Sequence, residues 1–218
     1  MTIPKDLLTL AIELSMLSSE TAENLAREAT RTGESAELLL ARRGLLSPIQ
    51  MDVLQTLRRP NEVIPGYELL SLIGHGGMGV VYRARQRALD RIVAIKAILV
   101  SQMSDVKFAT RFEQEARAVA KLQHPNIIQA FDFGQQDGRL FFVMEFVEGG
   151  NLRDLLTIRK KLQPPDVMRI LDDTASALVH ASSKGFSHRD MKLTNILLSS
   201  QGPVKLVDFG LAGVQQSG

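Results

Sequence analysis

The segment GFSHRDMKLTNILL, residues 185–198, places a His, an Arg, an Asp, a Lys and an Asn within eight consecutive positions. Asp190 can accept a proton, Lys192 can neutralise a phosphate, and Asn195 can offer an amide oxygen to a hard cation. A polar surface turn would explain any two of these residues, but it explains five in so short a stretch poorly. The residue types and their spacing therefore predict proton transfer and phosphate chemistry at this loop.

A second carboxylate, Asp208, follows the apolar run VKLV and precedes Phe209 and Gly210. A carboxylate in that place can bind a metal ion, or it can simply end a short strand in a turn. The residues alone leave both interpretations open.

The segment LIGHGGMGVVYRA has glycines at positions 74, 76, 77 and 79. Glycines allow backbone N–H groups to approach an anion closely, so the segment can cradle a phosphate; a plain hairpin is an equally good alternative. Strand-forming residues follow the last glycine, whereas a dinucleotide-binding glycine motif leads into a helix. The pattern predicts a flap made of a strand, a glycine loop and a strand.

Lys96 is the only charge in the apolar run IVAIKAILV. A buried unpaired ammonium costs several kcal/mol, so Lys96 must reach solvent, a carboxylate or a bound anion; a lysine on an edge strand is the alternative. A helix is expected at about residues 105–122, with its apolar stripe at Phe112, Ala116, Val119 and Leu122. Glu115 falls on that stripe and Glu113 does not, so we expect Glu115 to pair with Lys96.

The predicted elements change in type near residue 60. Helical spacing of apolar residues dominates residues 1–60, and RRPNEVIPGYE then breaks the pattern. Within the helical part, MLSSETAENL and LLSPIQMDVL look like imperfect copies, and Ser47 with Pro48 and Gln50 predicts a capping box. Strands are expected at residues 67–73, 80–87, 91–99, 127–133 and 140–146. Helices follow from Asn151 to Lys184-Gly185, and NILLSS and VKLVDF predict two short strands.

Composition narrows the class of protein. The chain has 218 residues, a formal net charge of +2 with scattered basic residues, and no cysteine. These features predict a globular protein without disulfides, thiolate metal sites or a nucleic-acid footprint. No segment approaches the roughly 20 apolar residues needed to span a bilayer. We expect a cytoplasmic location, and leave open a membrane span farther along the gene.

Taken together and in order, these motifs resemble the eukaryotic-like (Hanks-type) serine/threonine protein kinases of bacteria. Gly74, Gly76, Gly79 and Val81 match G-x-G-x-x-G-x-V, and Ala94-Ile95-Lys96 matches the lysine strand. His188-Arg189-Asp190 with Asn195 matches H-R-D-x-x-x-x-N, and Asp208-Phe209-Gly210 matches D-F-G.

The resemblance implies an α+β fold. It comprises a kinase N-lobe at residues 67–146, with a five-stranded antiparallel sheet and one helix, and a partial helical C-lobe at 147–218. A linker at 61–66 would join them to the small all-α unit at 1–60, whose role is unassigned and which could bind a protein partner.

The resemblance also implies the chemistry, which is transfer of the γ-phosphoryl group of Mg-ATP to a serine or threonine hydroxyl of a protein substrate. Asp190 would accept the hydroxyl proton, Lys192 would steady the phosphoryl group, and Lys96, positioned by Glu115, would hold the α- and β-phosphates. Asn195 and Asp208 would bind Mg²⁺.

The ATP site implied by the resemblance includes the flap, the apolar residues around adenine and the hinge between the lobes. Met144 would stand in the gatekeeper place, with backbone groups of Glu145 and Val147 facing the base. The full set of expected ATP-binding residues is Ile73, Gly74, His75, Gly76, Gly77, Met78, Gly79, Val80, Val81, Ala94, Lys96, Met144, Glu145, Val147 and Leu197.

Two expectations concern activity. The resemblance covers about residues 66–213, and the family pattern continues beyond D-F-G into an activation segment and further helices. We therefore expect these 218 residues to transfer phosphate weakly or not at all. The alternative function is a non-catalytic ATP-binding or scaffold protein, although every catalytic position present has the residue that an enzyme requires.

Overall fold

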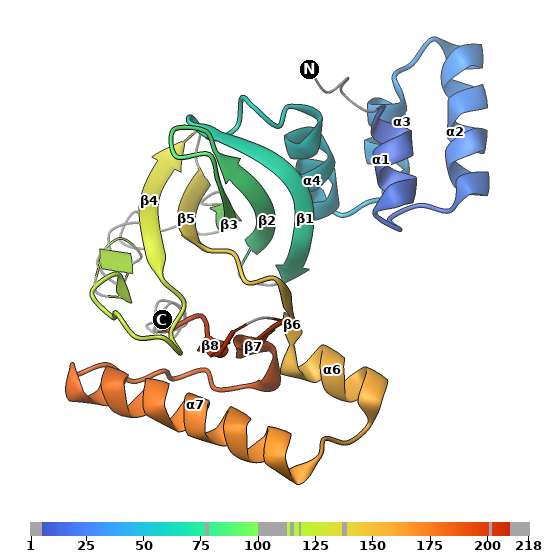
Figure 1. Ribbon diagram of the computed structural model, residues 1–218. Helices are drawn as coiled ribbons and strands as arrows, with labels where there is room; N and C mark the ends of the chain where they lie inside the picture. Colours follow the sequence, from blue (N-terminus) through green and yellow to red (C-terminus); the bar gives the residue numbers. More distant parts are fainter. Residues whose placement is uncertain are drawn as a thin grey trace.

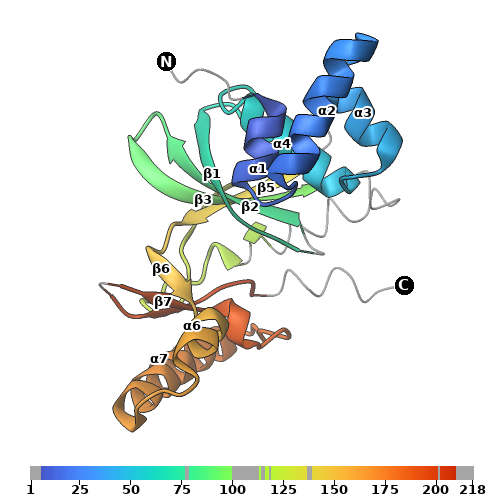
Figure 2. The ribbon, with the colours of Figure 1, turned by 90° about the vertical axis from the view of Figure 1, so that its right-hand side faces the viewer.

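The structure of the chain is a computed structural model that describes residues 6–76, 79–99, 113, 116–117, 119–136, 139–200 and 202–209. Three parts follow one another: helices α1 to α4, a five-stranded sheet, and a lower part that combines helices with a three-stranded sheet (Figure 1). Turned by 90°, the same parts show the large sheet above the lower strands and helices (Figure 2). Among the described residues, none of the helices combines the length and the hydropathy of a membrane-spanning segment.

The N-terminal part consists of α1 (Leu7–Glu13), α2 (Ser19–Thr32), α3 (Ala36–Arg43) and α4 (Pro48–Arg58). Each helix follows a residue whose side chain accepts a hydrogen bond from the first turn, namely Asp6, Ser18, Ser35 and Ser47. The predicted capping box of α4 is confirmed, because Ser47 and Gln50 each accept a bond from the other's backbone N–H.

The two segments that resemble each other in sequence also share a backbone conformation. Ser15 has φ +54° three residues before the cap Ser18, and Gly44 has φ +59° three residues before the cap Ser47. A left-handed residue ends the first helix of each pair, and a capping serine begins the second. The α1–α2 and α3–α4 junctions therefore share a backbone conformation as well as a sequence pattern.

The large sheet has the order β1-β2-β3-β5-β4 and is antiparallel throughout. Its strands are β1 (Tyr67–Gly76), β2 (Gly79–Gln86), β3 (Arg91–Leu99), β4 (Ala130–Gln136) and β5 (Arg139–Glu145). The predicted five-stranded antiparallel sheet is confirmed.

The predicted start of β4 is wrong, since β4 begins at Ala130 and not at residue 127. Ile127 instead forms a parallel bridge with Leu206, and the Ile128 N–H donates to the Leu206 carbonyl at 2.9 Å. Because the backbone of these residues is bonded to the lower sheet, it cannot join the upper one. Strands β1 and β4 also each end three residues later than predicted, at Gly76 and Gln136.

The helix expected at residues 105–122 lies mostly outside the described residues. Of that stretch, residues 113, 116, 117 and 119 are helical. Ala116, Val119 and Leu122 are buried, as the predicted apolar stripe requires. Glu115 and Phe112 lie outside the described residues, and so does the predicted contact between Glu115 and Lys96.

Helix α4 packs on the large sheet as well as on the other helices. Val53 of α4 is fully buried in one core with Tyr82, Ile95 and Val143 from three strands. Asp52 forms an ion pair with Arg139 at the start of β5. The change from helices to strands near residue 60 is therefore not a boundary between hydrophobic cores, because α4 shares a core with the large sheet.

The lower part consists of β6 (Gly149–Asn151), α6 (Leu152–Arg159), α7 (Pro164–Ser183), a 3₁₀ turn (Leu193–Asn195), β7 (Ile196–Ser199) and β8 (Val204–Leu206). The two predicted short strands, β7 and β8, pair with each other, and β6 adds a third strand that the sequence pattern did not indicate. Helix α7 ends at Lys184 and Gly185 as predicted, with φ +80° at the glycine.

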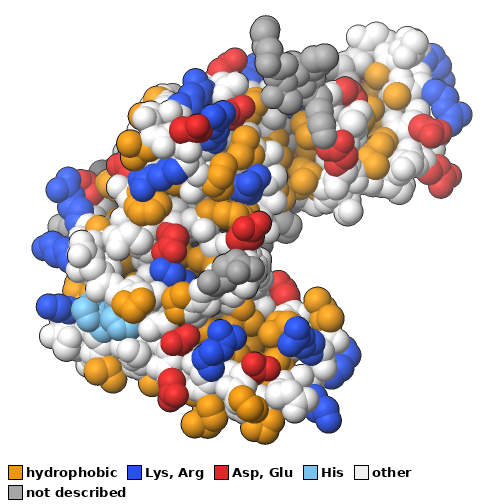
Figure 3. Space-filling view, in the orientation of Figure 1, with side chains coloured by type: hydrophobic (Ala, Val, Ile, Leu, Met, Phe, Trp, Pro, Cys, Tyr) orange, Lys and Arg blue, Asp and Glu red, His pale blue; other side chains and the backbone are white. Residues whose placement is uncertain are grey.

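Basic and acidic side chains are interspersed over the described part of the face in Figure 3. That face has no patch of a single sign, which agrees with the small net charge of +2.

Candidate active site

Lys96 and Asp208 form a short ion pair, although 112 residues separate them in sequence. Lys96 Nζ lies 2.7 Å from Asp208 Oδ1, and the two side chains are 6% and 24% exposed. Strand β3 lies between β2 and β5, so the alternative of an edge-strand lysine is wrong. A nearly buried ammonium here requires an anionic partner, and in this structure Asp208 provides it.

Asp208 lies at the junction of two hydrophobic cores. Val207 packs in the upper core with Ala94 and Met144, whereas Phe209 packs in the lower core, which includes residues of α7. The backbone of Asp208 has φ +61°, a left-handed conformation that is uncommon for a residue with a side chain. The packing of both neighbours holds the carboxylate toward Lys96.

Asp190 is held by two side chains of its own loop. Lys192 Nζ lies 2.7 Å from Asp190 Oδ2, and the Asn195 amide donates to the same oxygen at 3.2 Å and to the Asp190 carbonyl at 2.9 Å. The hydrogen bond from Lys192 is the main reason that the pKa of Asp190 lies below its ordinary value. Asp190 therefore stays ionised near neutral pH and can accept a proton.

Asn195 is 3% exposed, which is unusually buried for an amide side chain. Its nitrogen is turned toward Asp190, so its amide oxygen is the atom that could bind a cation. The backbone carbonyl of Asn195 accepts a hydrogen bond from the Val207 N–H at 3.1 Å. The loop with Asp190 and the segment with Asp208 are thereby connected directly.

His188 makes the second connection, and the expected site residues did not include it. The ring is 3% exposed, its Nε2–H donates to the Val207 carbonyl at 2.9 Å, and it lies against Phe209 with ring centroids 4.6 Å apart. Burial lowers the pKa of His188 more strongly than the nearby charges of Asp208 and Asp190 raise it. Its place two residues before Asp190 was the available signal in the sequence.

The predicted flap is confirmed as a hairpin of β1 and β2. Gly74 pairs with Val81, and Gly76 with Gly79. Gly79 has φ +126°, and a Cβ there would lie 2.2 Å from the Ala97 carbonyl oxygen of β3. A Cβ on Gly74 would meet nothing within 4 Å, so the hairpin is open at that residue. Gly77 and Met78 lie outside the described residues, as does the side chain of His75.

The apolar residues expected around adenine share one core. Ala94 and Met144 are buried there, and Val81, Val147 and Leu197 pack against them. Val80 does not join them. Its side chain lies in the core that faces α4, because side chains alternate between the two faces of a strand. Val80 stays in the expected ATP site as a flap residue, where only its backbone could contact a nucleotide. Ile73 is half exposed, at an irregularity in the pairing of β1.

The expected hinge follows β5. The Glu145 N–H already donates to the Gln129 carbonyl at 2.9 Å, so only the Glu145 carbonyl could bond to a base. The Glu145 carboxylate points elsewhere, to Lys205 Nζ at 2.8 Å. The sequence predicted that the backbone of Glu145 would face the base, but it did not predict Lys205 as the partner of its side chain.

Comparison with known proteins places this site in a family. The family model described as "Protein kinase domain" matches residues 67–218, which is more than half of the chain. The chain belongs to the protein kinase family.

The relatives are bacterial serine/threonine-protein kinases. The kinase PrkC of Bacillus subtilis is 40% identical over 146 residues, which are 67% of this chain and 22% of PrkC. The kinase pkn3 of Myxococcus xanthus is 42% identical over 156 residues, which are 69% of this chain and 28% of pkn3. The resemblance to Hanks-type bacterial kinases is confirmed. The matched region spans only about a quarter of the length of these relatives.

Solved structures agree on the fold. The PknI kinase domain of Mycobacterium tuberculosis, as its C20A_R136N double mutant, superposes with a TM-score of 0.64 at 30% identity. The superposition covers 70% of this chain and 64% of that domain. The kinase family membership places the large sheet in the N-lobe and the segments from β6 onward in the C-lobe.

Proposed function

We propose that this protein transfers the γ-phosphoryl group of Mg-ATP to a serine or threonine hydroxyl of a protein substrate. The single observation that supports this proposal most is the meeting of Lys96 and Asp208 at 2.7 Å, beside the loop that holds Asp190 and Asn195. These four residues come from three kinase motifs, the lysine strand, H-R-D-x-x-x-x-N and D-F-G, and they lie in one region of the structure.

Lys96 and the β1–β2 hairpin suit the binding of a triphosphate. The Lys96 ammonium is nearly buried and fixed on a central strand, so it is positioned to share its charge between Asp208 and the α- and β-phosphates. The β1–β2 hairpin would cover the phosphates, and the open side of Gly74 leaves room for backbone N–H groups to approach them.

The acidic and amide groups fit magnesium. Mg²⁺ usually takes one or two protein ligands and completes its octahedral shell with phosphates and water. Asp208 and the Asn195 amide oxygen provide such a small set, and among the described residues no cluster of three or more acidic or histidine ligands competes with it. Bound Mg²⁺ would neutralise charge on the phosphates.

The catalytic step follows from the Asp190 loop. The Asp190 carboxylate would accept the proton as the substrate oxygen forms its bond to the γ-phosphorus, and ADP would leave with the bridging oxygen. Lys192, paired with Asp190 and about half exposed, can turn toward the transferred group. The low pKa of Asp190 keeps the acceptor ionised at neutral pH.

The apolar core supports adenine binding at the junction of the lobes. Val81, Ala94, Met144, Val147 and Leu197 would surround the base, with the Glu145 carbonyl and the Val147 N–H toward its polar edge.

The test has a binding arm and a transfer arm. Titration calorimetry should detect Mg-ATP binding to wild type, with affinity about tenfold lower in Lys96→Met through loss of the charge on the phosphates. Phosphate transfer to a generic basic protein should vanish in Asp190→Asn, while Mg-ATP binding persists. Equal ATP affinity in wild type and Lys96→Met would contradict the role of Lys96. Because we expect transfer by these 218 residues to be weak, the same assay is repeated with a chain extended beyond Gly218. Tight ATP binding with equal transfer by the extended wild type and its Asp190→Asn variant would favour the alternative of a non-catalytic ATP-binding protein.

A further inference from the structure

The Glu145 side chain takes part in a contact that the proposed function does not use. Its Oε2 accepts a hydrogen bond from Lys205 Nζ at 2.8 Å and from the Gln129 N–H at 3.3 Å. The Lys205 and Glu145 side chains are 15% and 29% exposed. Such a partly buried, hydrogen-bonded ion pair is better ordered than an ion pair on the surface.

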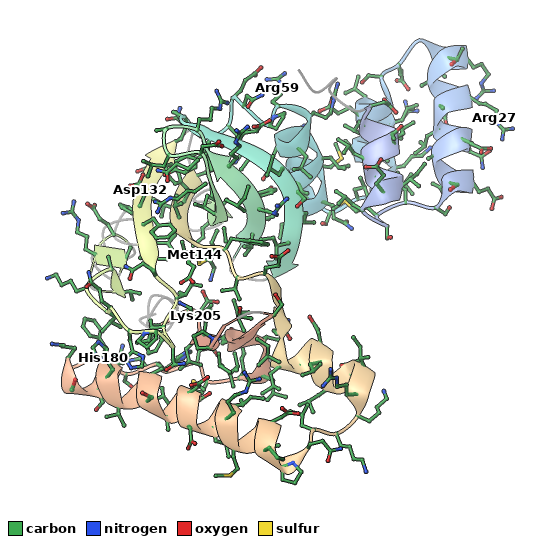
Figure 4. The ribbon with its side chains drawn as sticks, viewed as in Figure 1. Arg27, Arg59, Asp132, Met144, His180 and Lys205 are labelled. Atoms are coloured by element: carbon green, nitrogen blue, oxygen red, sulfur yellow. The ribbon has the colours of Figure 1, made fainter. Side chains whose placement is uncertain are left out.

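The ion pair completes a closed ring of contacts among three segments. The Glu145 N–H donates to the Gln129 carbonyl at 2.9 Å, and the Ile128 N–H donates to the Leu206 carbonyl at 2.9 Å. Lys205 precedes Leu206 in β8, and its side chain returns to Glu145. Figure 4 shows Lys205 between the end of the large sheet, near Met144, and helix α7. The hinge, the segment before β4 and strand β8 are therefore joined in one unit.

Two members of this ring, Lys205 and Glu145, are each close in sequence or in register to groups of the nucleotide site. Lys205 pairs in register with Leu197, which packs in the apolar core around the expected adenine position. Three residues after Lys205 comes Asp208, the partner of Lys96. Glu145 itself has the backbone carbonyl that would bond to the polar edge of the base.

We propose that Glu145 is a positioning residue for adenine, whose carboxylate, held by Lys205 and Gln129, orients the hinge backbone toward the base. This inference rests on the proposed binding of ATP. The hinge carbonyl suits the amino group of adenine, whereas guanine presents a carbonyl oxygen at the same position and is repelled. A firmly held hinge therefore selects ATP over GTP, and a loosened hinge loses that preference.

The experiment measures the ratio of Mg-ATP to Mg-GTP affinity by calorimetry. Glu145→Gln keeps an acceptor for the Gln129 N–H and removes the charge, and Lys205→Met removes the other partner. Each should lower ATP affinity about tenfold and GTP affinity much less, so the preference for ATP falls. The double variant should be no worse than either single variant, because both remove the same contact. The exchange Glu145→Lys with Lys205→Glu should recover part of the preference.

Arg139→Met is the matched control. It removes another partly buried ion pair, between Arg139 and Asp52, at the opposite end of the same strand. It should lower thermal stability without changing the ratio of ATP to GTP affinity. A change of ratio in this control equal to that in Glu145→Gln would overturn the inference, since general destabilisation would then explain both.

The remaining outcomes are also decisive. An unchanged ratio in both Glu145→Gln and Lys205→Met, with ATP binding intact, overturns the inference and leaves the proposed function standing. Absence of ATP binding in wild type overturns both. If Glu145→Gln does not fold, Lys205→Met and Lys205→Gln provide the same measurement, because their substitutions leave the hinge sequence intact.

Discussion

His188 offers a sharp test of how the Asp190 loop and the Asp208 segment are joined. His188→Phe keeps a ring against Phe209 and removes the hydrogen bond to the Val207 carbonyl. Leaving that carbonyl without its donor in a buried place costs about 1–3 kcal/mol. His188→Ala also removes the buried ring, so we expect a total loss of about 3–5 kcal/mol. These losses are a large part of a typical domain stability of about 5–15 kcal/mol.

The pH dependence of stability provides a second measurement on the same residue. Burial lowers the pKa of folded His188 below its ordinary value of 6.5, so the unfolded chain binds this proton more tightly. The stabilisation is therefore present above about pH 6.5 and is lost as the pH falls through the folded pKa. His124 has a pKa lowered mainly by burial and contributes in the same direction. The difference between wild type and His188→Phe isolates the part due to His188.

Urea unfolding of wild type, His188→Phe and His188→Ala between pH 7.5 and 5.5 would measure both effects. We expect the stability of wild type to fall more steeply with acid than that of His188→Phe. A loss below about 0.5 kcal/mol in His188→Phe at pH 7.5 would refute the role of the hydrogen bond. Identical pH profiles in wild type and His188→Phe would refute the assigned effect of burial on the histidine.

Three further predictions concern the flap, α4 and Asp190. Gly79→Ala should destabilise the protein by about 2–4 kcal/mol, because φ is +126° and the new Cβ would lie 2.2 Å from the Ala97 carbonyl; a wild-type melting temperature would contradict this. Val53→Ala should cost about 2–3 kcal/mol and lower the melting of the helical unit and the sheet together; a sheet that melts as in wild type would show that α4 is not part of its core. Lys192→Met should raise the pKa of Asp190 toward its ordinary value, and a carboxyl titration followed by NMR that did not move upward would exclude Lys192 as the main cause of the lowered pKa.

The sequence alone determined the features that depend on neighbouring residues. The capping box at Ser47 and Gln50 forms within one helical turn, so residue types were enough to predict it. The alternation of side chains along β2 places Val80 and Val81 on opposite faces of the sheet by the same kind of local rule. The ordered motifs identified the kinase family because the residue types and spacing within each motif can be read from a few neighbouring positions.

Tertiary structure decided every contact between distant segments. Nothing near Lys96 in sequence indicates Asp208, 112 residues away, as its partner, and nothing near Glu145 indicates Lys205. The start of β4 and the packing of Val53 on the sheet were likewise set by long-range contacts. The physical reason is that capping and alternation are satisfied within a few residues, whereas a buried charge or an apolar face finds its partner only when the whole chain has folded.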